Sequence, residues 1–469
     1  MSRTETRRPG AAAEPAPAGD TVGPGVEVRS FRPLLYDPRR TSDLSAVLAP
    51  PYDVIDPTER RLLLERHRHN CVRLILPQAP AREPQERKYV RASNDLRCWL
   101  CRGVLRESEQ PAVFVLREEF ELEGRRHSRL SFIAAVRLEP LGSGPIYPHE
   151  ETMGEARRDR LALLRTTRAN LSLVMGLFRD VLPADGGKGT VSGILNEVSA
   201  GDPLLEAVGP GGVGLSLWAV TSPAVVSRLA SEMGRRELFI ADGHHRYETA
   251  LAFARQEGAL GSSDPQGAGF VPMQCVAMED PGLLALPTHR LFPSHLQVEE
   301  KRFLKQAEQY FEVEEVPRPG VGLSGLRKAM RRSYDPGGRS HQHVFGLYGR
   351  DRRACLLRLR REEALDGIEC PYDHEARRLD VCVFQELIVK KAFDLDFSLA
   401  ARDGTLRFTH TFAEGEQRVG SGEIALAFFV NPTPLAAIPM VARQGEVMPP
   451  KSTYFFPKVP AGLVFRLIR

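Results

Sequence analysis

The segment Glu237–Glu257, ELFIADGHHRYETALAFARQE, constrains the fold more than any other stretch of the chain. Its apolar first half predicts a strand that ends at Asp242-Gly243, and a helical pattern begins immediately afterwards. Gly243 permits a tight turn and lets a ligand approach the backbone closely. Asp242 is expected to cap the helix by accepting backbone N–H groups. The segment therefore predicts a strand, a sharp turn and a helix.

The first helical turn of this segment carries His244, His245 and Arg246. Cationic groups are unfavourable there because the helix dipole is positive at the N-terminus. A bound anion would compensate, and a phosphate fits such a site. The alternative is that the histidines satisfy hydrogen bonds in the core and the arginine is a solvated surface charge. Zinc ligation by the two histidines is disfavoured, since adjacent side chains on a helix diverge.

Length and composition indicate a globular protein of more than one domain. The chain has 469 residues, and a domain typically takes ~100–200. Hydrophobic residues make up 42% and charged residues 26%, which excludes wholesale disorder. The net charge is only +4 and is not concentrated on one element, so no nucleic-acid partner is expected.

Neither a membrane span nor a secretory signal is predicted. The most apolar stretch, Ile424–Val441, is interrupted by Asn431 and three prolines, whereas a bilayer helix needs ~20 unbroken apolar residues. The N-terminus is a Pro/Ala/Gly-rich tail that lacks the apolar stretch of a signal peptide. We therefore expect no membrane partner and a cytoplasmic location. Cys98 and Cys101 form a CxxC pair without a second pair, so they predict a helix face, not a zinc site.

Helical and strand patterns mix along the chain without a strict βαβ repeat, which predicts an α+β protein with a mixed sheet. Cys71–Gln78 is expected to be a buried strand, and Tyr89–Arg102 an amphipathic helix. Ala112–Glu139 predicts two strands joined by a turn at Glu123-Gly124. Leu379–Phe393 is expected to be a helix.

Three further polar clusters are candidates for chemistry. In Pro148-His149-Glu150 a glutamate beside a histidine could serve as a general base, and an exposed loop is the alternative. In Pro450-Lys451-Ser452-Thr453 a lysine and two hydroxyls could bind a carboxylate or phosphate, again with a surface loop as the alternative. Thr288-His289-Arg290 is a similarly ambiguous cluster at a strand end.

Several familiar motifs are absent or out of place. GPGGVG, at residues 209–214, does not follow a strand and precede a helix, so it does not indicate a dinucleotide-binding fold. GGKGT, at residues 186–190, lacks parts of a P-loop, and no GxSxG occurs. No interleaving of basic and aromatic residues favours RNA binding.

Five strings taken together resemble the bacterial and archaeal family named domain of unknown function 1015 (DUF1015). They occur in order from about Phe31 to Ile468, nearly the whole predicted folded region. The strings are APPYDVI, PHEETM with DRLALLRTTRANLS, ADGHHRYETAL, LLALPTHRL and MPPKSTYFFPK. The family name itself implies no function.

The DGHHR string is also similar to the phosphate-binding signature of the ParB/sulfiredoxin superfamily, and in particular to that of the free L-serine kinases. Those kinases share the order PHE, DGHHR and PK[ST]T. The resemblance implies a ParB/sulfiredoxin-like core in which Glu150 is the catalytic base. It implies that Asp242 and His245 are catalytic residues as well. It also implies phosphate contacts for Asp242, Gly243, His244, His245 and Arg246, and substrate contacts for His149, Lys451, Ser452 and Thr453. The 92 residues that separate Glu150 from Asp242 are more than in the compact serine kinases, so this stretch is expected to hold an insertion.

These patterns predict a division of the chain into five regions. They are a disordered tail (1–26), an N-terminal α+β region (27–140), the phosphate-binding core (141–296), a C-terminal α+β region (297–440) and an extended segment returning to the site (441–469). The expected function is a phosphotransferase that uses ATP or ADP with Mg²⁺, which Asp242 could contact, and a hydroxyl compound such as L-serine. The alternatives are a nucleotide-binding regulatory switch without turnover and a purely structural protein.

Overall fold

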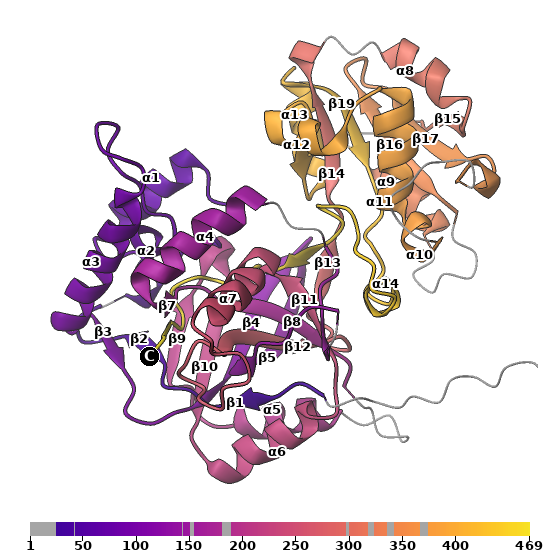
Figure 1. Cartoon of the computed structure of the whole chain (residues 1–469). Coiled ribbons are helices and arrows are strands. Elements are labelled where there is room, and N and C mark those ends of the chain that lie inside the picture. Colours follow the sequence, from indigo (N-terminus) through magenta and orange to yellow (C-terminus); the bar gives the residue numbers. More distant parts are fainter. Residues whose placement is uncertain are drawn as a thin grey trace, which may run out of the picture.

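The computed structural model of the chain describes residues 25–41, 43–142, 144–150, 154–180, 189–296, 300–317, 323–334, 342–365 and 374–469, without the side chains of residues 154–156 and 374–375. All but the last two residues of the predicted tail lie outside these ranges. The described chain forms two lobes, each built around a sheet (Figure 1). No helix within these ranges is long and apolar enough to cross a bilayer.

The larger lobe contains a mixed sheet in the strand order β6-β11-β8-β12-β5-β4-β10-β9, with β1 paired to β5. The pairs β11·β6 and β12·β8 are parallel, and the other pairs are antiparallel. This mixed sheet confirms the predicted α+β class. Its strands are β1 (Val28–Arg29), β4 (Val113–Leu122), β5 (Arg125–Arg137), β6 (Ile146–Tyr147), β8 (Val174–Phe178), β9 (Leu205–Val208), β10 (Gly214–Val220), β11 (Leu238–Asp242) and β12 (Phe270–Ala277).

Both faces of the large sheet are buried, as alternate residues of β4 show. Val113 and Val115 belong to one core cluster, while Phe114 and Leu116 belong to another. Helices α4 to α7 pack on the first side, and α14 with the C-terminal segment packs on the second. Helices α1 to α3 gather beside the sheet (Figure 1). These helices are α1 (Pro57–Arg66), α2 (Val72–Ile75), α3 (Arg87–Cys101), α4 (Gly154–Thr167), α5 (Thr190–Val198), α6 (Pro223–Met233), α7 (His244–Gln256) and α14 (Ala437–Arg443).

The smaller lobe is an antiparallel sheet in the order β15-β17-β16-β19-β14-β18, covered by short helices. Its strands are β14 (His289–Pro293), β15 (Phe311–Glu315), β16 (Val344–Gly349), β17 (Ala354–Leu359), β18 (Arg407–Thr409) and β19 (Ile424–Phe429). Its helices are α8 (Glu300–Ala307), α9 (Ser324–Ser333), α10 (His374–Arg377), α11 (Asp380–Val383), a π-helix (Phe384–Ala392), α12 (Phe397–Asp403) and α13 (Phe412–Gly420). Short 3-10 helices occupy Ser294–Leu296 and Glu362–Leu365 in this lobe, and Leu44–Ala46 and Pro210–Gly212 in the larger one.

After β19 the chain returns from the smaller lobe to the larger one. β20 (Tyr454–Phe456) pairs with β13 (Leu284–Leu286), and β21 (Arg466–Leu467) pairs with β7 (Ala169–Asn170). A further small sheet pairs β2 (Leu34–Tyr36) with β3 (Leu105–Glu107). The region boundaries near residues 140, 296 and 440 stay predictions.

One predicted element is wrong in type. Cys71–Gln78 was expected to be a strand, but it contains the helix α2. The Asn70 side chain accepts from the Val72 backbone N–H at 2.9 Å and donates to the carbonyls of Ala46 and Leu48. A side chain that bonds its own backbone two residues on initiates a turn, and a short apolar run cannot by itself distinguish a strand from a buried helix.

The predicted turn between β4 and β5 is confirmed. Glu123 and Gly124 connect the two strands, with φ of 53° and 74°. Two consecutive residues with positive φ make the type I′ turn that matches strand twist.

A fully buried ion pair joins the middle of the large sheet to the C-terminal segment. Arg129 and Glu118, each 0% exposed, form two hydrogen bonds of 2.8 Å. Gln274 donates to the same carboxylate at 2.7 Å. Arg129 also donates to the carbonyls of Phe456 and Pro457, at 3.3 and 2.9 Å. The pair therefore fixes the backbone just before Lys458.

We expect Arg129→Met to lower the free energy of unfolding by about 3–5 kcal/mol, because it leaves Glu118 charged and unpaired in the core. Adding Glu118→Leu should recover much of that loss, since the uncompensated charge is then removed. Urea unfolding followed by circular dichroism measures both effects.

The surface ion pair of Arg443 with Glu237 provides a control. Arg443→Met should change stability by no more than about 1 kcal/mol. An Arg129→Met protein as stable as this control would contradict the role given to the buried pair.

Candidate functional site

The strand-to-helix turn is formed as the sequence predicts. β11 ends at Asp242, Gly243 has φ 86°, and α7 begins at His244. A Cβ atom at Gly243 would lie 2.7 Å from Nε of Arg246, so the turn requires glycine on both grounds. The expected cap is wrong, because the capping position is Gly243 and no side chain caps α7.

Instead of capping the helix, Asp242 forms a buried charge cluster with two cations. One carboxylate oxygen accepts from Arg246 and the other from Lys458. Asp242 is 7% exposed. Burial raises the pKa of this carboxyl, but the charges of Lys458 and Arg246 outweigh burial and hold it below its usual range. Asp242 is therefore ionised and fixed between strand, helix and C-terminal segment.

Two buried histidines lie beside this cluster. The rings of His149 and His244 contact each other edge to face, with centroids 4.7 Å apart. Nδ1 of His149 is 2.5 Å from the Ile240 carbonyl, so it carries the proton, and Nε2 accepts from the Thr453 hydroxyl at 2.8 Å. Burial lowers the pKa of His149 to about 4, and burial also lowers the pKa of His244 well below its usual value. Both imidazoles are therefore neutral at pH 7.

Glu150 follows directly and contacts the C-terminal segment. Its Oε1 accepts from the Lys451 backbone N–H at 3.0 Å, and the neighbouring Met448 N–H donates to the His149 carbonyl at 2.8 Å. Burial raises the pKa of Glu150, although the Lys451 N–H and nearby cations partly offset that effect. A carboxylate with a raised pKa is suited to accept a proton near neutral pH.

The Lys451–Thr453 segment is brought to the site, but its side chains are placed differently. Lys451 is exposed and has φ 65°, an uncommon conformation for a residue other than glycine. Thr453 contacts His149. Ser452 is buried, and its hydroxyl donates to the Pro449 carbonyl at 2.6 Å. The Ser452 hydroxyl is therefore used within the segment itself, and the substrate contact predicted for it stays a prediction.

His245 lies half-buried in the first turn of α7. Burial lowers its pKa, while Glu248 and Asp53 act in the opposite direction and the charges of Arg246 and Lys451 add to the lowering. The contacts of His149 with His244 and Thr453, and of Glu150 with Lys451, bring the PHE, DGHHR and PK[ST]T segments to one place.

Sequence reasoning missed Lys458, which pairs with Asp242, and Tyr454, whose ring lies 4.7 Å from the Lys458 ammonium. His410 of the smaller lobe stacks on Tyr454, with ring centroids 3.5 Å apart. The signal for Lys458 was available, because only nine of the 64 basic residues are lysines and this one follows the PK[ST]T segment closely.

No group of three or more His, Cys, Asp or Glu side chains within the described ranges could hold a metal ion. Both oxygens of Asp242 are engaged by cations, so this carboxylate does not fit the predicted magnesium contact.

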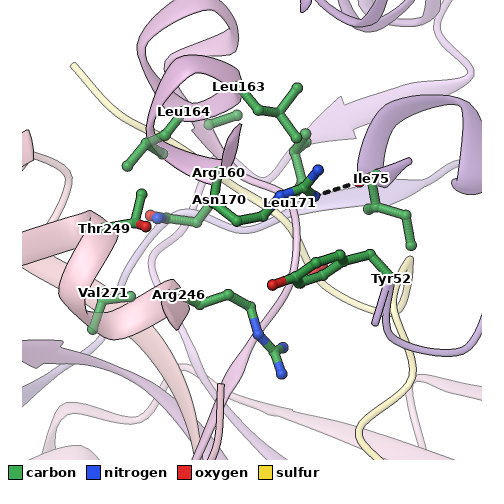
Figure 2. Close-up of a pocket in the computed structure, with 12 residues that line it drawn as sticks. Tyr52, Ile75, Arg160, Leu163, Leu164, Asn170, Leu171, Arg246, Thr249 and Val271 are labelled. Atoms are coloured by element: carbon green, nitrogen blue, oxygen red, sulfur yellow. Dashed lines mark hydrogen bonds between the residues drawn. The ribbon is translucent and has the colours of Figure 1, made fainter. Parts of the chain in front are cut away.

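Arg246 also lines a pocket (Figure 2). Tyr52 and Arg246 approach it from opposite sides, and the Arg160 guanidinium lies 4.1 Å from the centre of the Tyr52 ring. The Thr249 hydroxyl and Nε of Arg246 are buried without a hydrogen-bond partner among the described residues. The other lining residues are mainly apolar: Ile75, Leu163, Leu164, Ala169, Asn170, Leu171, Ser172 and Val271.

The family model described as "Protein of unknown function (DUF1015)" matches residues 28–382. No curated protein matches the sequence. Among solved structures, a conserved hypothetical protein from Pyrococcus furiosus is 14% identical, with coverage of 68% of this chain and 90% of that chain and a TM-score of 0.32.

A free serine kinase in complex with AMP is 13% identical, with coverage of 66% and 83% and a TM-score of 0.32. A mutant of the free serine kinase in complex with ADP is 12% identical, with coverage of 66% and 84% and a TM-score of 0.34. Similarities this distant do not assign an activity.

The lowered pKa of His149 makes stability depend on pH. The unfolded imidazole takes up a proton near its ordinary pKa of 6.5, whereas the folded one does so only near 4. Stability should therefore fall as the pH falls between these values, by about 2 kcal/mol between pH 7 and pH 5. Relative to wild type, His149→Gln should lose about 2 kcal/mol less over that range. Urea unfolding at both pH values measures the difference.

The exposed His295 gives the matched control, since His295→Gln should keep the pH dependence of wild type. Equal pH dependence in His149→Gln and wild type would show that the buried imidazole is not held neutral.

Proposed function

The chain belongs to the DUF1015 family, whose name assigns no activity. From the geometry of its site we propose that the protein is a phosphotransferase. It would move a phosphoryl group from ATP or ADP to a hydroxyl compound such as L-serine. The site lies in what we propose is a ParB/sulfiredoxin-like core. The observation that carries the proposal is the convergence of three segments distant in sequence. Glu150 binds Lys451, His149 contacts both His244 and Thr453, and Asp242 pairs with Lys458.

The start of α7 supports phosphate binding. Its cap residue Gly243 brings no side chain, and no side chain among the described residues caps the helix, so this helix N-terminus suits an anion. Arg246 and Lys458 add two positive charges, of which Asp242 balances one. Phosphoryl transfer depends mainly on positioning and on neutralising charge, and these groups would supply both.

The pocket beside Arg246 is placed to take the nucleoside. It shares Arg246 with the charge cluster, so a nucleotide could extend from one to the other. The Tyr52 ring and the leucines offer apolar surface for a base. The Thr249 hydroxyl, which has no partner among the described residues, offers a hydrogen bond.

Glu150 would act as the general base on the acceptor hydroxyl, because its raised pKa favours proton uptake near neutral pH. His149 orients the Thr453 hydroxyl through Nε2, and its protonated Nδ1 is held by a backbone carbonyl. Lys451, exposed beside Glu150, and the more distant half-buried His245 complete the proposed contacts. Any Mg²⁺ would enter with the nucleotide phosphates.

A regulatory switch that binds nucleotide without turnover is the second candidate. It needs the phosphate site and the pocket but has no use for a base, so Glu150 distinguishes the two functions.

Arg246→Ala should weaken nucleotide binding by about 1.5–3 kcal/mol, the scale of a hydrogen bond to a charged group. Thermal shift and calorimetric titration with ATP, ADP, CTP and GTP measure the loss. A nucleotide at 100 times its Kd should stabilise wild type by about 2.7 kcal/mol.

Arg255 is exposed in the last turn of the same helix and provides the control. Arg255→Ala should bind nucleotide as wild type does. If Arg246→Ala binds every nucleotide equally well, the phosphate site is assigned wrongly.

Glu150→Gln keeps the shape of the side chain and removes its basicity. We expect it to bind nucleotide normally and to transfer phosphate about 10²–10⁴ times more slowly. The wild-type rate should fall as the pH drops through the raised pKa of Glu150, because the base must be ionised. Mass spectrometry of phospho-products with serine, threonine and homoserine measures the rates.

Nucleotide binding without transfer by either protein would favour the switch. Equal transfer by both proteins would remove Glu150 from the base role and leave Asp242 as the next candidate, although its two ion pairs make it a poorer one.

A further inference from the structure

Among the described residues, three arginines are less than 2% exposed, and two of them have full sets of acceptors. Arg129 pairs with Glu118 and donates to two backbone carbonyls. Arg466 donates from all three nitrogens to the Asn170 side chain and to the carbonyls of Pro265, Gly267 and Phe270. The third, Arg290, is 1% exposed and differs from both.

Arg290 has few acceptors for a buried cation. Nη1 donates to the Thr288 carbonyl, and Nη2 reaches the Lys451 carbonyl only at 3.4 Å. Nε has no hydrogen-bond partner in the part of the chain that the structure describes. Burial lowers the pKa of Arg290 to about 10, which leaves the guanidinium charged at pH 7. None of the described carboxylates forms an ion pair with Arg290, although the charge of Glu150 opposes the lowering of its pKa, and a buried charge without a paired anion is costly.

The under-used edge of Arg290 has a defined geometry. Nε and Nη2 lie on one side of a guanidinium and together can hold both oxygens of a carboxylate. Arg129 uses this same pair of nitrogens, since its Nε and Nη2 bind the two oxygens of Glu118. In Arg290, Nη2 makes only one long hydrogen bond, and Nε makes none to the described residues.

A second polar group without a partner among the described residues lies beside Arg290. Thr288 directly precedes β14, and its backbone carbonyl accepts from Nη1 of Arg290, so the two residues are in contact. The Thr288 hydroxyl is buried, with 2% of the residue exposed, and has no partner among the described residues. The Thr288 hydroxyl and Nε of Arg290 are thus two neighbouring donors that one acceptor group could bind.

The backbone of Lys451 connects the Nε–Nη2 edge of Arg290 to Glu150, where the acceptor hydroxyl is proposed to bind. The Lys451 N–H binds Glu150, and the Lys451 carbonyl is the distant acceptor of Arg290. A carboxylate could take the place of that carbonyl at Nη2 and add the missing bond at Nε. A hydroxyl on the same small molecule would then lie toward Glu150.

We infer that Arg290, with Thr288, binds the carboxylate of the phosphate acceptor, so that the acceptor is a hydroxy acid or hydroxy amino acid. This inference rests on the proposed function for the identity of the molecule. The site itself is a specificity determinant contributed by the smaller lobe, and it excludes alcohols that lack an acidic group.

The test compares three pairs of small molecules that differ only in the carboxylate: L-serine and L-serinamide, L-threonine and L-threoninamide, glycolate and glycolamide. Calorimetric titration of the whole protein with ADP present measures binding without requiring turnover. Wild type should bind at least one acid about 10–100 times more tightly than its amide, the scale of a charged bidentate pair. Arg290→Lys keeps the charge but loses the paired donors, so it should abolish most of this preference.

Thr288→Val, which preserves the side-chain shape, should reduce the same preference severalfold and serves if Arg290→Lys does not fold. ADP binding at the wild-type level checks that each variant retains its structure. Equal binding of acid and amide by wild type, no binding of any pair, or an unchanged preference in the variants would overturn the inference. Failure of the proposed function is a separate result, seen as carboxylate-selective binding without any phosphoryl transfer.

Discussion

The arrangement of the site depends on the buried carboxylate of Asp242. It ends β11, and its two oxygens bind Arg246 from α7 and Lys458 from the C-terminal segment. Removing Asp242 would leave two cations without their carboxylate partner in a buried position, which costs several kcal/mol. One interaction thus joins a strand, the helix that follows it, and residues more than 200 positions later.

Lys458 reaches Asp242 because other contacts first hold the C-terminal segment against the large sheet. The Arg129–Glu118 pair binds the carbonyls immediately before Lys458. Further along, Arg466 donates to the loop that precedes β12. Because these anchors lie on both sides of Lys458, the position of the lysine is set by the sheet. The buried polar groups of the large lobe therefore serve placement as much as stability.

The sequence was most informative where the chemistry is local. The glycine at position 243 and the turn at Glu123-Gly124 follow from backbone conformations that few residues tolerate, and both were predicted. The helix α2 and the pairing of Asp242 with Lys458 were not, because they depend in part on distant residues that no local pattern specifies. Lys458 could have been suspected from the scarcity of lysine, but only the pairing geometry gives it a role.

The balance of charge around the site connects the two proposals. Among the described residues, Arg246, Lys458, Arg290 and Lys451 bring four positive charges, while Asp242, Glu150 and Asp53 bring at most three negative ones. The neighbouring histidines do not add to this excess, because burial keeps His149 and His244 neutral. In a region of low dielectric such an excess is unfavourable until anions enter. A nucleotide phosphate at α7 and a carboxylate at Arg290 would each offset part of it, so that the same electrostatic imbalance favours binding of donor and acceptor together.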